Sequence, residues 1–409
     1  MILVLAATLV GEAAASAATG AAATSSLRAE LARAWRGTGA TVGAYVADIA
    51  TPTALFSFKG AVARSPASVE KLYTTATALA RFGVDGELDT TVLGVGRLDA
   101  NGTWLGDLYL HGGGDPTFGS GSFIHDNYSG GASVEALALA LEHHAGITRV
   151  TGSVIGDESL LDGLRGGPDT SFAPDPEITG TLSALAFDRG RAGSTQSPAD
   201  YAALRLAGAL RHDGVVVDGR THTGTAPPSA ALLAAIGSPP MRTLARMTDL
   251  QSDNFFAEML LKDLGAYYGH DGSTAGGSAV VRQWLAQIGV HPRIYDGSGL
   301  DRADHTSPAQ VVALLRSLAV GVQGAALRAA LPVAGRSGTL TYRMRATAAA
   351  GHCEAKTGTL SDASALAGWC DGATGPRFAF AFLANHADVT SARAAEDRMT
   401  VTLARFARP

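Results

Sequence analysis

The sequence predicts an α+β fold in which an antiparallel sheet with helices on both faces is interrupted in the chain by a mixed α/β insertion. Two strand patterns near the start, over residues 41–50 and 54–60, and three near the end, over residues 354–360, 365–370 and 377–386, supply the sheet. The long interval between the two groups contains both strand and helix patterns. A chain of 409 residues also exceeds one ordinary core, which favours more than one domain.

Besides a helical stretch that follows Asn254, three helices are expected in the part of the chain that forms this sheet. One precedes the first strand, over residues 26–37, and another closes the chain near residues 389–406. The third follows Ser65, which is predicted to be its N-cap, with Pro66 as the first helical residue. Its buried stripe is predicted to consist of Leu72, Ala76, Leu79 and Ala80.

The insertion is expected over residues 88–235, which divides the remaining domain into residues 26–87 and 236–409. TTVLGVGRL and TWLGDLYLHG, joined by a turn at residues 99–102, predict a hairpin. ITRVTGSVIGD predicts a further strand, and SVEALALALEHH and SPADYAALRLAGAL predict two helices. Ser197 is placed to cap the second of them.

Composition indicates an ordinary globular protein and argues against one class of partner. Hydrophobic residues make up 46% of the chain and charged residues 17%. The formal net charge is −5, so the sequence has no excess of basic residues that could bind a phosphate backbone. We therefore expect no binding to nucleic acid.

The N-terminus has the features of an export signal. MILVLAATLV is an apolar run of signal-peptide length, and Ala15-Ser16-Ala17 provides a small-x-small cleavage site. We therefore expect residues 1–17 to be a signal peptide and the mature protein to be exported to the cell envelope, either periplasmic or extracellular. The run is too short to span a bilayer, so no transmembrane span is expected in the mature chain. The usual basic segment before the apolar run is absent, and a disordered Ala-rich tail is the alternative.

Cys353 and Cys370 are the only cysteines in the sequence. A hairpin centred between Ser361 and Asp362 would place them directly opposite each other, at a separation that a disulfide can bridge. Two buried free thiols are the alternative.

Lysine is rare in this chain, and one of its four lysines follows a serine by three residues. Ser68 and Lys71 lie in the first turns of the helix expected after Ser65, on the same face. A hydroxyl at this position lies beside backbone N–H groups that have no intrahelical acceptor, at the positive end of the helix dipole. A desolvated lysine next to it can act as a general base. The alternative is a solvent-exposed lysine in the first turn of a helix, with no catalytic role.

Two further short motifs contain rare residues. QSDNFF contains Ser252 and Asn254, one of four asparagines in the chain, and CEAKTGTL contains Lys356-Thr357-Gly358. Separately they could be a helix cap and a strand before a turn. The joint chance of Ser-x-x-Lys, Ser-x-Asn and Lys-Thr-Gly in one chain is on the order of a few in a thousand.

The three motifs together resemble those of the penicillin-recognising serine acyltransferases. PASVEKLYTTATAL, LHGGGDPTF, QSDNFFAEMLLKDLG, YDGSGLDR, LPVAGRSGTLTYRM and AKTGTLSDASALAG are similar to segments of the low-molecular-mass penicillin-binding proteins that are D-alanyl-D-alanine carboxypeptidases and endopeptidases. The similarity runs from about residue 27 to the end of the chain. It implies a transpeptidase/β-lactamase-like core, in which long insertions between the first two motifs are typical.

The resemblance implies a role for each residue of the first two motifs. Ser68 would attack the carbonyl of the penultimate D-alanine and become an acyl-enzyme. Lys71 would take the proton of Ser68. Ser252 would relay a proton to the leaving amine, and Asn254 would hold Lys71 or the substrate amide.

The third motif would bind the end of the substrate. Lys356 would attract its terminal carboxylate, which the hydroxyls of Thr357 and Thr359 would bind. Gly358 would let the strand approach the substrate backbone closely. The N–H groups of Ser68 and Thr359 would form the oxyanion hole.

The partners implied are peptidoglycan stem peptides and β-lactam antibiotics, with no cofactor and no metal. The groups that resemble metal ligands are His111 with Asp115 and Glu142-His143-His144, and the second is expected on a solvated helix face.

There are two alternative functions. A serine β-lactamase would need a base for rapid deacylation, but no Glu-x-x-Leu-Asn segment occurs between the first two motifs. A non-catalytic peptidoglycan-binding scaffold is disfavoured because all three motifs are intact. The segment DGSGL is expected to be a tight loop near the cleft with no catalytic role.

Overall fold

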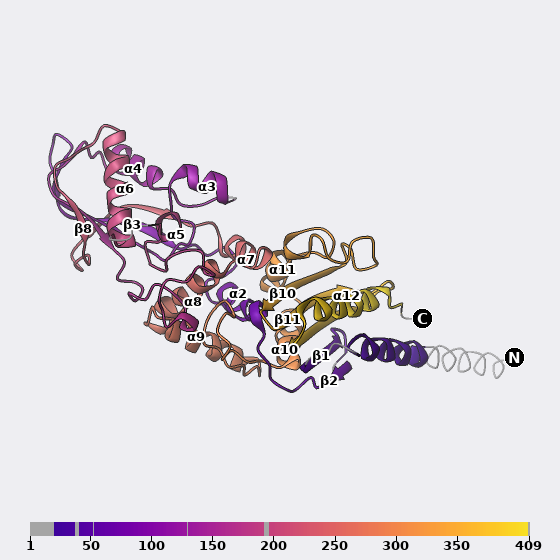
Figure 1. The fold of residues 1–409 in the computed structure, drawn as a ribbon. Helices are drawn as coiled ribbons and strands as arrows, with labels where there is room; N and C mark the ends of the chain where they lie inside the picture. Colours follow the sequence, from indigo (N-terminus) through magenta and orange to yellow (C-terminus); the bar gives the residue numbers. More distant parts are fainter. Residues whose placement is uncertain (1–19, 37–40, 52, 129, 192–195, 408–409) are drawn as a thin grey trace.

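A computed structural model describes residues 20–36, 41–51, 53–128, 130–191 and 196–407 of the chain. The predicted signal peptide, residues 1–17, lies outside the described residues. Two sheets, each with its own covering helices, organise the described part (Figure 1).

The elements follow one another in an order that places the second sheet within the sequence of the first. A helix over residues 20–34 precedes the first strand. The remaining elements are β1 (Thr41–Asp48), β2 (Ala54–Phe58), η1 (Ala67–Glu70), α2 (Lys71–Arg81), β3 (Asp89–Leu98), β4 (Thr103–His111), α3 (Gly121–Asn127), α4 (Val134–His143), β5 (Arg149–Val150), β6 (Val154–Asp157), η2 (Pro168–Thr170), α5 (Phe187–Gly190), α6 (Pro198–His212), β7 (Val216–Val217), β8 (Thr221–Thr223), β9 (Ala231–Gly237), α7 (Met241–Leu250), α8 (Asn254–Gly269), α9 (Thr274–Gln287), α10 (Pro308–Ser317), α11 (Val322–Ala330), η3 (Gly338–Leu340), β10 (Cys353–Leu360), β11 (Ala363–Asp371), β12 (Arg377–Asn385) and α12 (Val389–Arg405).

The first sheet is antiparallel throughout, with strand order β10-β11-β12-β1-β2. Its central strand, β12, is buried on both faces, and its sequence RFAFAFLAN explains how. Because successive side chains point to opposite faces, the three phenylalanines line one face and the intervening alanines the other. The predicted strand positions in the first and last parts of the chain are confirmed.

Helices cover both faces of this sheet. The phenylalanine face packs against α12 and the helix over residues 20–34, where Trp35 meets Phe382 edge-on with ring centroids 6.5 Å apart. The alanine face packs against α10 and the helices around α2. Small side chains on that face let the helical layer approach the strands closely. The predicted antiparallel sheet with helices on both faces is confirmed.

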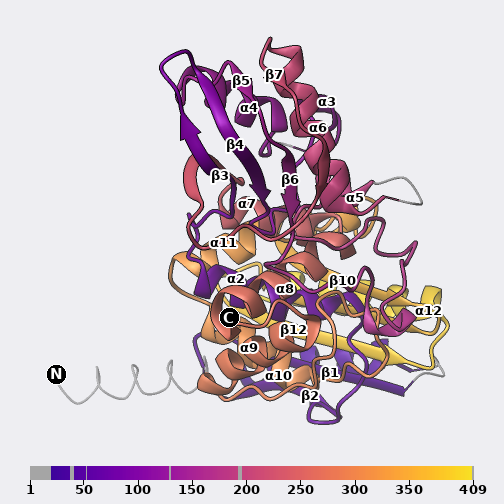
Figure 2. The same ribbon diagram turned by 90° about the vertical axis from the view of Figure 1, so that its left-hand side faces the viewer.

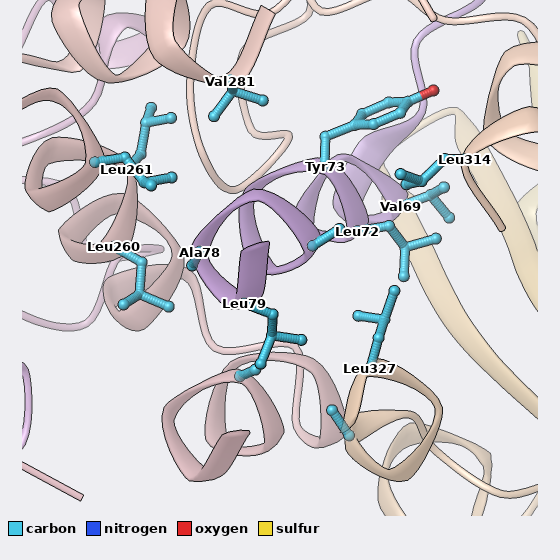
Figure 3. Packing of buried hydrophobic residues seen from close by; sticks show 14 of the residues in the cluster. Val69, Leu72, Tyr73, Ala78, Leu79, Leu260, Leu261, Val281, Leu314 and Leu327 are labelled. Carbon is cyan, nitrogen blue, oxygen red and sulfur yellow. The ribbon is translucent and has the colours of Figure 1, made fainter. Parts of the chain in front are cut away.

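Helix α2 lies in the middle of the helical layer and is surrounded by other elements (Figure 3). Every residue from Lys71 to Leu79 is buried. Leu260 and Leu261 of α8, Val281 of α9 and Leu327 of α11 pack around it. A helix enclosed in this way has no solvent face, so even its first residue, a lysine, is desolvated.

The start of this helix differs from the prediction. The chain forms the 3₁₀ turn η1 before α2, and Pro66 rather than Ser65 occupies the N-cap position. Asn385 of β12 binds the backbone of Ser65 on both sides, accepting from its N–H and donating to its carbonyl, each at 3.0 Å. The Ser65 backbone is therefore held by β12, and its hydroxyl makes no cap hydrogen bond.

The second sheet has strand order β7-β5-β4-β3-β9, with β6 paired to β4 and β8 paired to β6, and α4 and α6 pack on it. Figure 2 shows this part above the first sheet and its helices. The predicted hairpin is β3–β4, whose turn is tied by Asp99, and Ser197 caps α6 as predicted. The single strand expected at residues 147–157 is two strands instead, because the Asp107 side chain accepts the Ser153 N–H at 2.7 Å and interrupts the ladder. The insertion limits of 88–235 stay a prediction.

Other boundaries agree with the sequence or differ by a few residues. The leading helix was expected over residues 26–37, of which residue 37 lies outside the described residues. Among the described residues this helix covers 20–34, because the Ala-rich stretch before residue 26 also favours helix. Helix α12 fits the expected closing helix. Within the described part of the chain, no helix combines the length and the apolar character needed to cross a bilayer.

A disulfide joins the two cysteines. Cys353 of β10 and Cys370 of β11 are direct partners in the strand register, and the hairpin turns at Ser361 and Asp362 as predicted. Both side chains are fully buried on the α12 face of the sheet. The alternative of two free thiols is excluded in this structure.

We expect the double variant Cys353→Ala/Cys370→Ala to lose about 3 kcal/mol of unfolding free energy, because a bridge over a sequence separation of 17 restricts the unfolded chain. Guanidinium denaturation of the oxidised protein and of the variant measures the difference. The wild type in reductant serves as the control and should match the variant. Equal midpoints for oxidised and reduced wild type would contradict this expectation.

Candidate active site

The structure brings the three predicted motifs together where three elements meet. Ser68 lies in η1, and Lys71 begins α2. Ser252 and Asn254 lie at the junction of α7 and α8, and Lys356 lies in the middle of β10. These five residues, far apart in the sequence, form two neighbouring hydrogen-bonded groups, one of Ser68, Lys71 and Asn254 and the other of Ser252 and Lys356.

The ammonium of Lys71 joins the first two motifs. Its Nζ donates to Ser68 Oγ at 2.9 Å, to Asn254 Oδ1 at 2.6 Å and to the Ser298 carbonyl at 2.6 Å. An ammonium has three donors, so this set of acceptors is complete. The side chain is fixed, and its nitrogen is held beside the hydroxyl of Ser68.

The environment of Lys71 favours its neutral form more than water does. Burial lowers the pKa of Lys71 to about 8, against the opposing effect of nearby carboxylates, of which Asp296 and Glu258 act most strongly. The side chain has no exposed surface. A buried lysine with a pKa in this range can take a proton near neutral pH, whereas an arginine could not.

The backbone on both sides of this lysine adopts unusual conformations. Ala67 and Ser252 have φ values of +46° and +61°, in the left-handed region that non-glycine residues seldom occupy. Gly299, with φ +81°, packs on Ala67, and a Cβ on it would lie 2.1 Å from the Ala67 carbonyl oxygen. Strain of this kind costs on the order of 1–3 kcal/mol for each residue and persists where the surrounding packing enforces it.

Lys356 holds the second motif from the opposite side. Its Nζ donates to Ser252 Oγ at 2.8 Å and to the Thr357 carbonyl at 2.8 Å. Burial, and then the charge of Lys71, lower the pKa of Lys356 well below its usual range, whereas Asp249 raises it. Asp249 accepts a hydrogen bond from Thr75, and burial raises its own pKa to about 7. Two lysines thus share one desolvated site.

A loop that follows the second sheet's β6 supports the second motif. Asp253 caps α8 and forms a two-pronged ion pair with Arg189, at 2.8 and 3.0 Å. The Asn254 amide donates to the Glu177 carbonyl at 2.9 Å, which leaves its oxygen directed at Lys71. Arg189 also lies over the ring of Phe255 at 4.6 Å. Residues 177 and 189 therefore fix the orientation of Asn254.

Strand β10 presents the third motif along the edge of the sheet. The hydroxyls of Thr357 and Thr339 are 2.7 Å apart. Thr359 is exposed and accepts a hydrogen bond from Arg393 of α12 at 2.7 Å. Both threonines can present a hydroxyl to a ligand beside this edge, and Arg393 adds a positive charge to it.

Gly358 lies at a close contact between β10 and η1. The space above its Cα is filled by the protein, since a Cβ would lie 2.6 Å from the Pro66 carbonyl oxygen and 3.2 Å from the Ala67 Cβ. The missing side chain therefore lets β10 pack against the start of η1, next to Ser68. The expected close approach of this strand to the substrate backbone stays a prediction.

Sequence reasoning did not find three contributors to this site. Ser298 lies in the DGSGL loop, which was expected near the cleft but without a catalytic role. It contributes its backbone carbonyl, and because every residue has one, the residue type gave no signal. Arg189 and Arg393 are two of 28 arginines, so their rarity gave no signal. Only the rare residues, Lys and Asn, could be recognised by counting.

Groups that might bind a metal are not assembled in the part of the chain that the structure describes. His111, considered above with Asp115, pairs instead with Asp157 at 3.0 Å. Asp115 accepts two hydrogen bonds from Thr117.

Comparison with known proteins identifies the family. The family model described as "D-Ala-D-Ala carboxypeptidase 3 (S13) family" matches residues 24–176 and 173–406. The chain belongs to the D-Ala-D-Ala carboxypeptidase 3 (S13) family. It is 30% identical over 443 aligned residues to the D-alanyl-D-alanine carboxypeptidase of Actinomadura sp., covering 90% of this chain and 82% of that protein. It is 31% identical to carboxypeptidase DacB of Mycolicibacterium smegmatis, covering 88% and 79% of the two chains.

Solved structures support the same fold for this S13 family member. Penicillin binding protein 4 (dacB) of Haemophilus influenzae superposes with a TM-score of 0.76 at 20% identity, covering 92% of this chain and 97% of that one. The same protein complexed with a β-lactam superposes with a TM-score of 0.72. The predicted penicillin-recognising fold and the resemblance to low-molecular-mass penicillin-binding proteins are confirmed.

We expect Gly358→Ala to destabilise the protein by about 1–3 kcal/mol, because the added methyl group overpacks the contact between β10 and η1. It should also slow acylation by benzylpenicillin, since β10 would move relative to Ser68. Denaturant unfolding and the rate of penicillin adduct formation measure the two effects.

Gly208→Ala is a matched control for this substitution. Gly208 lies on α6 with no atom within 4 Å of a built Cβ, so alanine there should add about 0.5–1 kcal/mol of stability and leave acylation unchanged. A Gly358→Ala protein as stable and as fast as the wild type would show that the contact has no such importance.

Proposed function

We propose that this chain is a serine D-alanyl-D-alanine carboxypeptidase, with endopeptidase activity on the same bond type, that acts on peptidoglycan stem peptides through an acyl-enzyme at Ser68. The observation that carries the proposal is the 2.9 Å contact between the nitrogen of a fully buried lysine, Lys71, and the hydroxyl of Ser68. Membership of the S13 family supports the reaction class.

In the first half-reaction, Ser68 Oγ attacks the carbonyl carbon of the penultimate D-alanine while neutral Lys71 takes the hydroxyl proton. The tetrahedral intermediate then collapses, its C–N bond breaks, and the departing amine of the terminal D-alanine receives a proton. Ser252, which accepts a hydrogen bond from Lys356, would relay that proton. In the second half-reaction, water hydrolyses the ester and restores Ser68.

The oxyanion and the substrate carboxylate need separate binding groups. The N–H groups of Ser68 and Thr359 would stabilise the oxyanion, because η1 and β10 pack side by side at this point. The hydroxyls of Thr357 and Thr359, with Lys356, would bind the terminal carboxylate. Arg393, which donates to Thr359, would add to the attraction of that carboxylate.

Substrate binding would also act on the base. Burial holds the pKa of Lys356 low, and a carboxylate arriving beside it would favour its charged form. The charge of Lys71 lowers the pKa of Lys356, and repulsion between two like charges is mutual, so charging Lys356 would favour neutral Lys71. The bound substrate would thereby help to create the base that starts the reaction.

Location and domain limits are part of the same proposal. A signal peptide at residues 1–17 would export the enzyme to the cell envelope, where peptidoglycan lies. The catalytic domain would comprise residues 26–87 and 236–409, with residues 88–235 as the inserted unit. β-Lactams would acylate Ser68 because they resemble the D-alanyl-D-alanine end of the substrate.

Mass spectrometry after incubation with benzylpenicillin tests the function directly. We expect a lasting adduct on the Ser68 peptide of the wild type and none on Ser68→Ala, because only the serine hydroxyl can form the ester. Rapid loss of penicillin without an adduct would indicate a β-lactamase. Absence of both adduct and turnover would leave only a non-catalytic, peptidoglycan-binding role.

The acylation rate should depend on pH through Lys71. Only its neutral form accepts a proton, and with a pKa of about 8 half of Lys71 is neutral at pH 8 and nearly all of it above about pH 9. We therefore expect the acylation rate to fall roughly tenfold for each pH unit well below about 8 and to level off above about pH 9. Stopped-flow or quenched-flow measurement between pH 6 and 9.5 gives the profile, and circular dichroism checks folding at each pH. A flat profile would show that another group takes the proton.

A further inference from the structure

The DGSGL loop is built around two buried carboxyl groups that lie behind Lys71. Asp296 Oδ1 accepts the N–H groups of Ser298 and Gly299, at 3.1 and 2.6 Å, and its Oδ2 accepts that of Asp301 at 2.7 Å. Glu258, from α8, reaches the same loop with Oε1 and accepts the N–H groups of Gly297 and Ser298, at 3.0 and 2.8 Å. Two carboxyl groups therefore hold the N–H groups of three successive residues.

Fixing these N–H groups also fixes the carbonyls. In a planar trans peptide, the carbonyl of one residue points away from the N–H of the next. Because Asp296 holds the Gly299 N–H, the Ser298 carbonyl points to the other side, where it accepts from Lys71 at 2.6 Å. Because Glu258 holds the Ser298 N–H, the Gly297 carbonyl likewise points outward and accepts from Thr74 at 3.0 Å.

The two carbonyls contact α2 at neighbouring positions. Lys71 and Thr74 are three residues apart and lie on one face of this helix. The loop therefore docks on the helix through a pair of backbone acceptors, and one of them completes the set of acceptors around the lysine. Gly299, held at φ +81° against the Ala67 carbonyl, leaves the loop no room to move toward Ser68.

We propose that Asp296 and Glu258 are positioning residues for the reaction. Asp296, through the Gly299 N–H, orients the Ser298 carbonyl that holds Lys71 beside Ser68, and Glu258, through the Ser298 N–H, orients the Gly297 carbonyl that docks the loop on Thr74. They touch neither the substrate nor Ser68 in this arrangement, and they act through the loop. The inference rests on the proposed role of Lys71 as base. It gives the DGSGL segment a part in the site that its sequence does not reveal.

The charged groups around Lys71 determine how the inference can be tested. Those that face it or its immediate partners come from every element packed against it: Glu70 of η1, Asp249 of α7, Asp253 and Glu258 of α8, Asp296 and Asp304 of the loop segment, and Lys356 of β10. Burial raises the pKa of Glu258 to about 8 and that of Glu70 and Asp304 well above their usual values. Below pH 8, replacing one of these carboxyl groups by its amide therefore changes the charge around Lys71 little. A substitution that removes a hydrogen-bond acceptor changes the loop itself.

The test compares Glu258→Met with Glu258→Gln. Methionine has a similar length but accepts no hydrogen bond from the loop, so we expect the plateau rate of Ser68 acylation by benzylpenicillin to fall at least about tenfold, the effect of one lost buried hydrogen bond. Without Glu258 the Gly297 carbonyl is no longer held on Thr74, so the loop undocks from α2 and the adjoining Ser298 carbonyl is displaced. The charged form of Lys71 then loses an acceptor, and the acid limb of the pH profile should move to lower pH. Glutamine keeps the acceptor oxygen and should restore the rate to within about threefold of the wild type.

Asp263→Asn is the matched control. Asp263 is also a buried carboxyl group of α8, but the charged groups that act on it are Asp115 and Lys262, away from the loop at residues 296–301. We expect the position of its acid limb to be that of the wild type. If Glu258→Met does not fold, as judged by circular dichroism and a cooperative thermal transition, Asp296→Asn provides the second variant. It keeps one acceptor oxygen and should lower the plateau rate through the hold on Gly299 or Asp301.

Two results would overturn the inference. One is a folded Glu258→Met or Asp296→Asn protein with the plateau rate and acid limb of the wild type. The other is a lower rate in Glu258→Met with an unmoved limb, matched by Asp263→Asn, which would indicate general destabilisation. Failure of the proposed function is distinguishable, because then the wild type itself would form no Ser68 adduct.

Discussion

The burial of the Lys71 ammonium is the constraint on which the arrangement of the site depends. A buried ammonium is costly unless each of its donors has an acceptor. Here the three acceptors come from three parts of the chain: the hydroxyl of Ser68, the amide oxygen of Asn254 and the carbonyl of Ser298. A change in any of these parts would leave a donor unsatisfied, so the position of the lysine links the nucleophile turn, the α7–α8 junction and the DGSGL loop.

The sheet and the loop after β6 supply the second level of support. Asn385 of β12 holds the backbone of Ser65 just before η1, and the glycine at position 358 lets β10 pack against the same turn. From the other side, Arg189 and the Glu177 carbonyl orient the start of α8. The part of the chain between the first two motifs therefore contributes directly to the geometry of the second motif.

Much of the fold could be predicted because its strands carry regular patterns. The alternation in RFAFAFLAN and the symmetric placement of Cys353 and Cys370 specify period and register within the sequence itself. The split of the strand at residues 147–157 could not be predicted, since it depends on the Asp107 side chain of another strand. The prediction that Ser65 is an N-cap was wrong for a similar reason, because Asn385, 320 positions away in the sequence, binds the Ser65 backbone.

The residues of the site likewise divide into those that the sequence could identify and those that it could not. Ser68, Lys71, Ser252, Asn254 and Lys356 could be found because lysine and asparagine are rare here and stand at meaningful spacings. The structure places these five residues together, and their individual roles remain proposals. Arg189, Arg393 and the Ser298 carbonyl could not be found, because an arginine among many and a backbone atom in a loop have no distinctive sequence. Contacts made by side chains of rare type are visible in a sequence, and contacts made by the backbone are not.

The backbone of Ala67 and Ser252 is strained, and the packing around these two residues offsets the free-energy cost of that strain. Each left-handed residue costs on the order of 1–3 kcal/mol, yet each adjoins a group that the proposed reaction needs in a fixed place. Close packing of Gly299 on Ala67 and the Lys356 contact to Ser252 maintain these conformations in the resting protein. The polar groups are therefore already paired and oriented before a substrate arrives. A site organised in this way requires little rearrangement as charge develops, which is the physical basis of electrostatic stabilisation in a desolvated pocket.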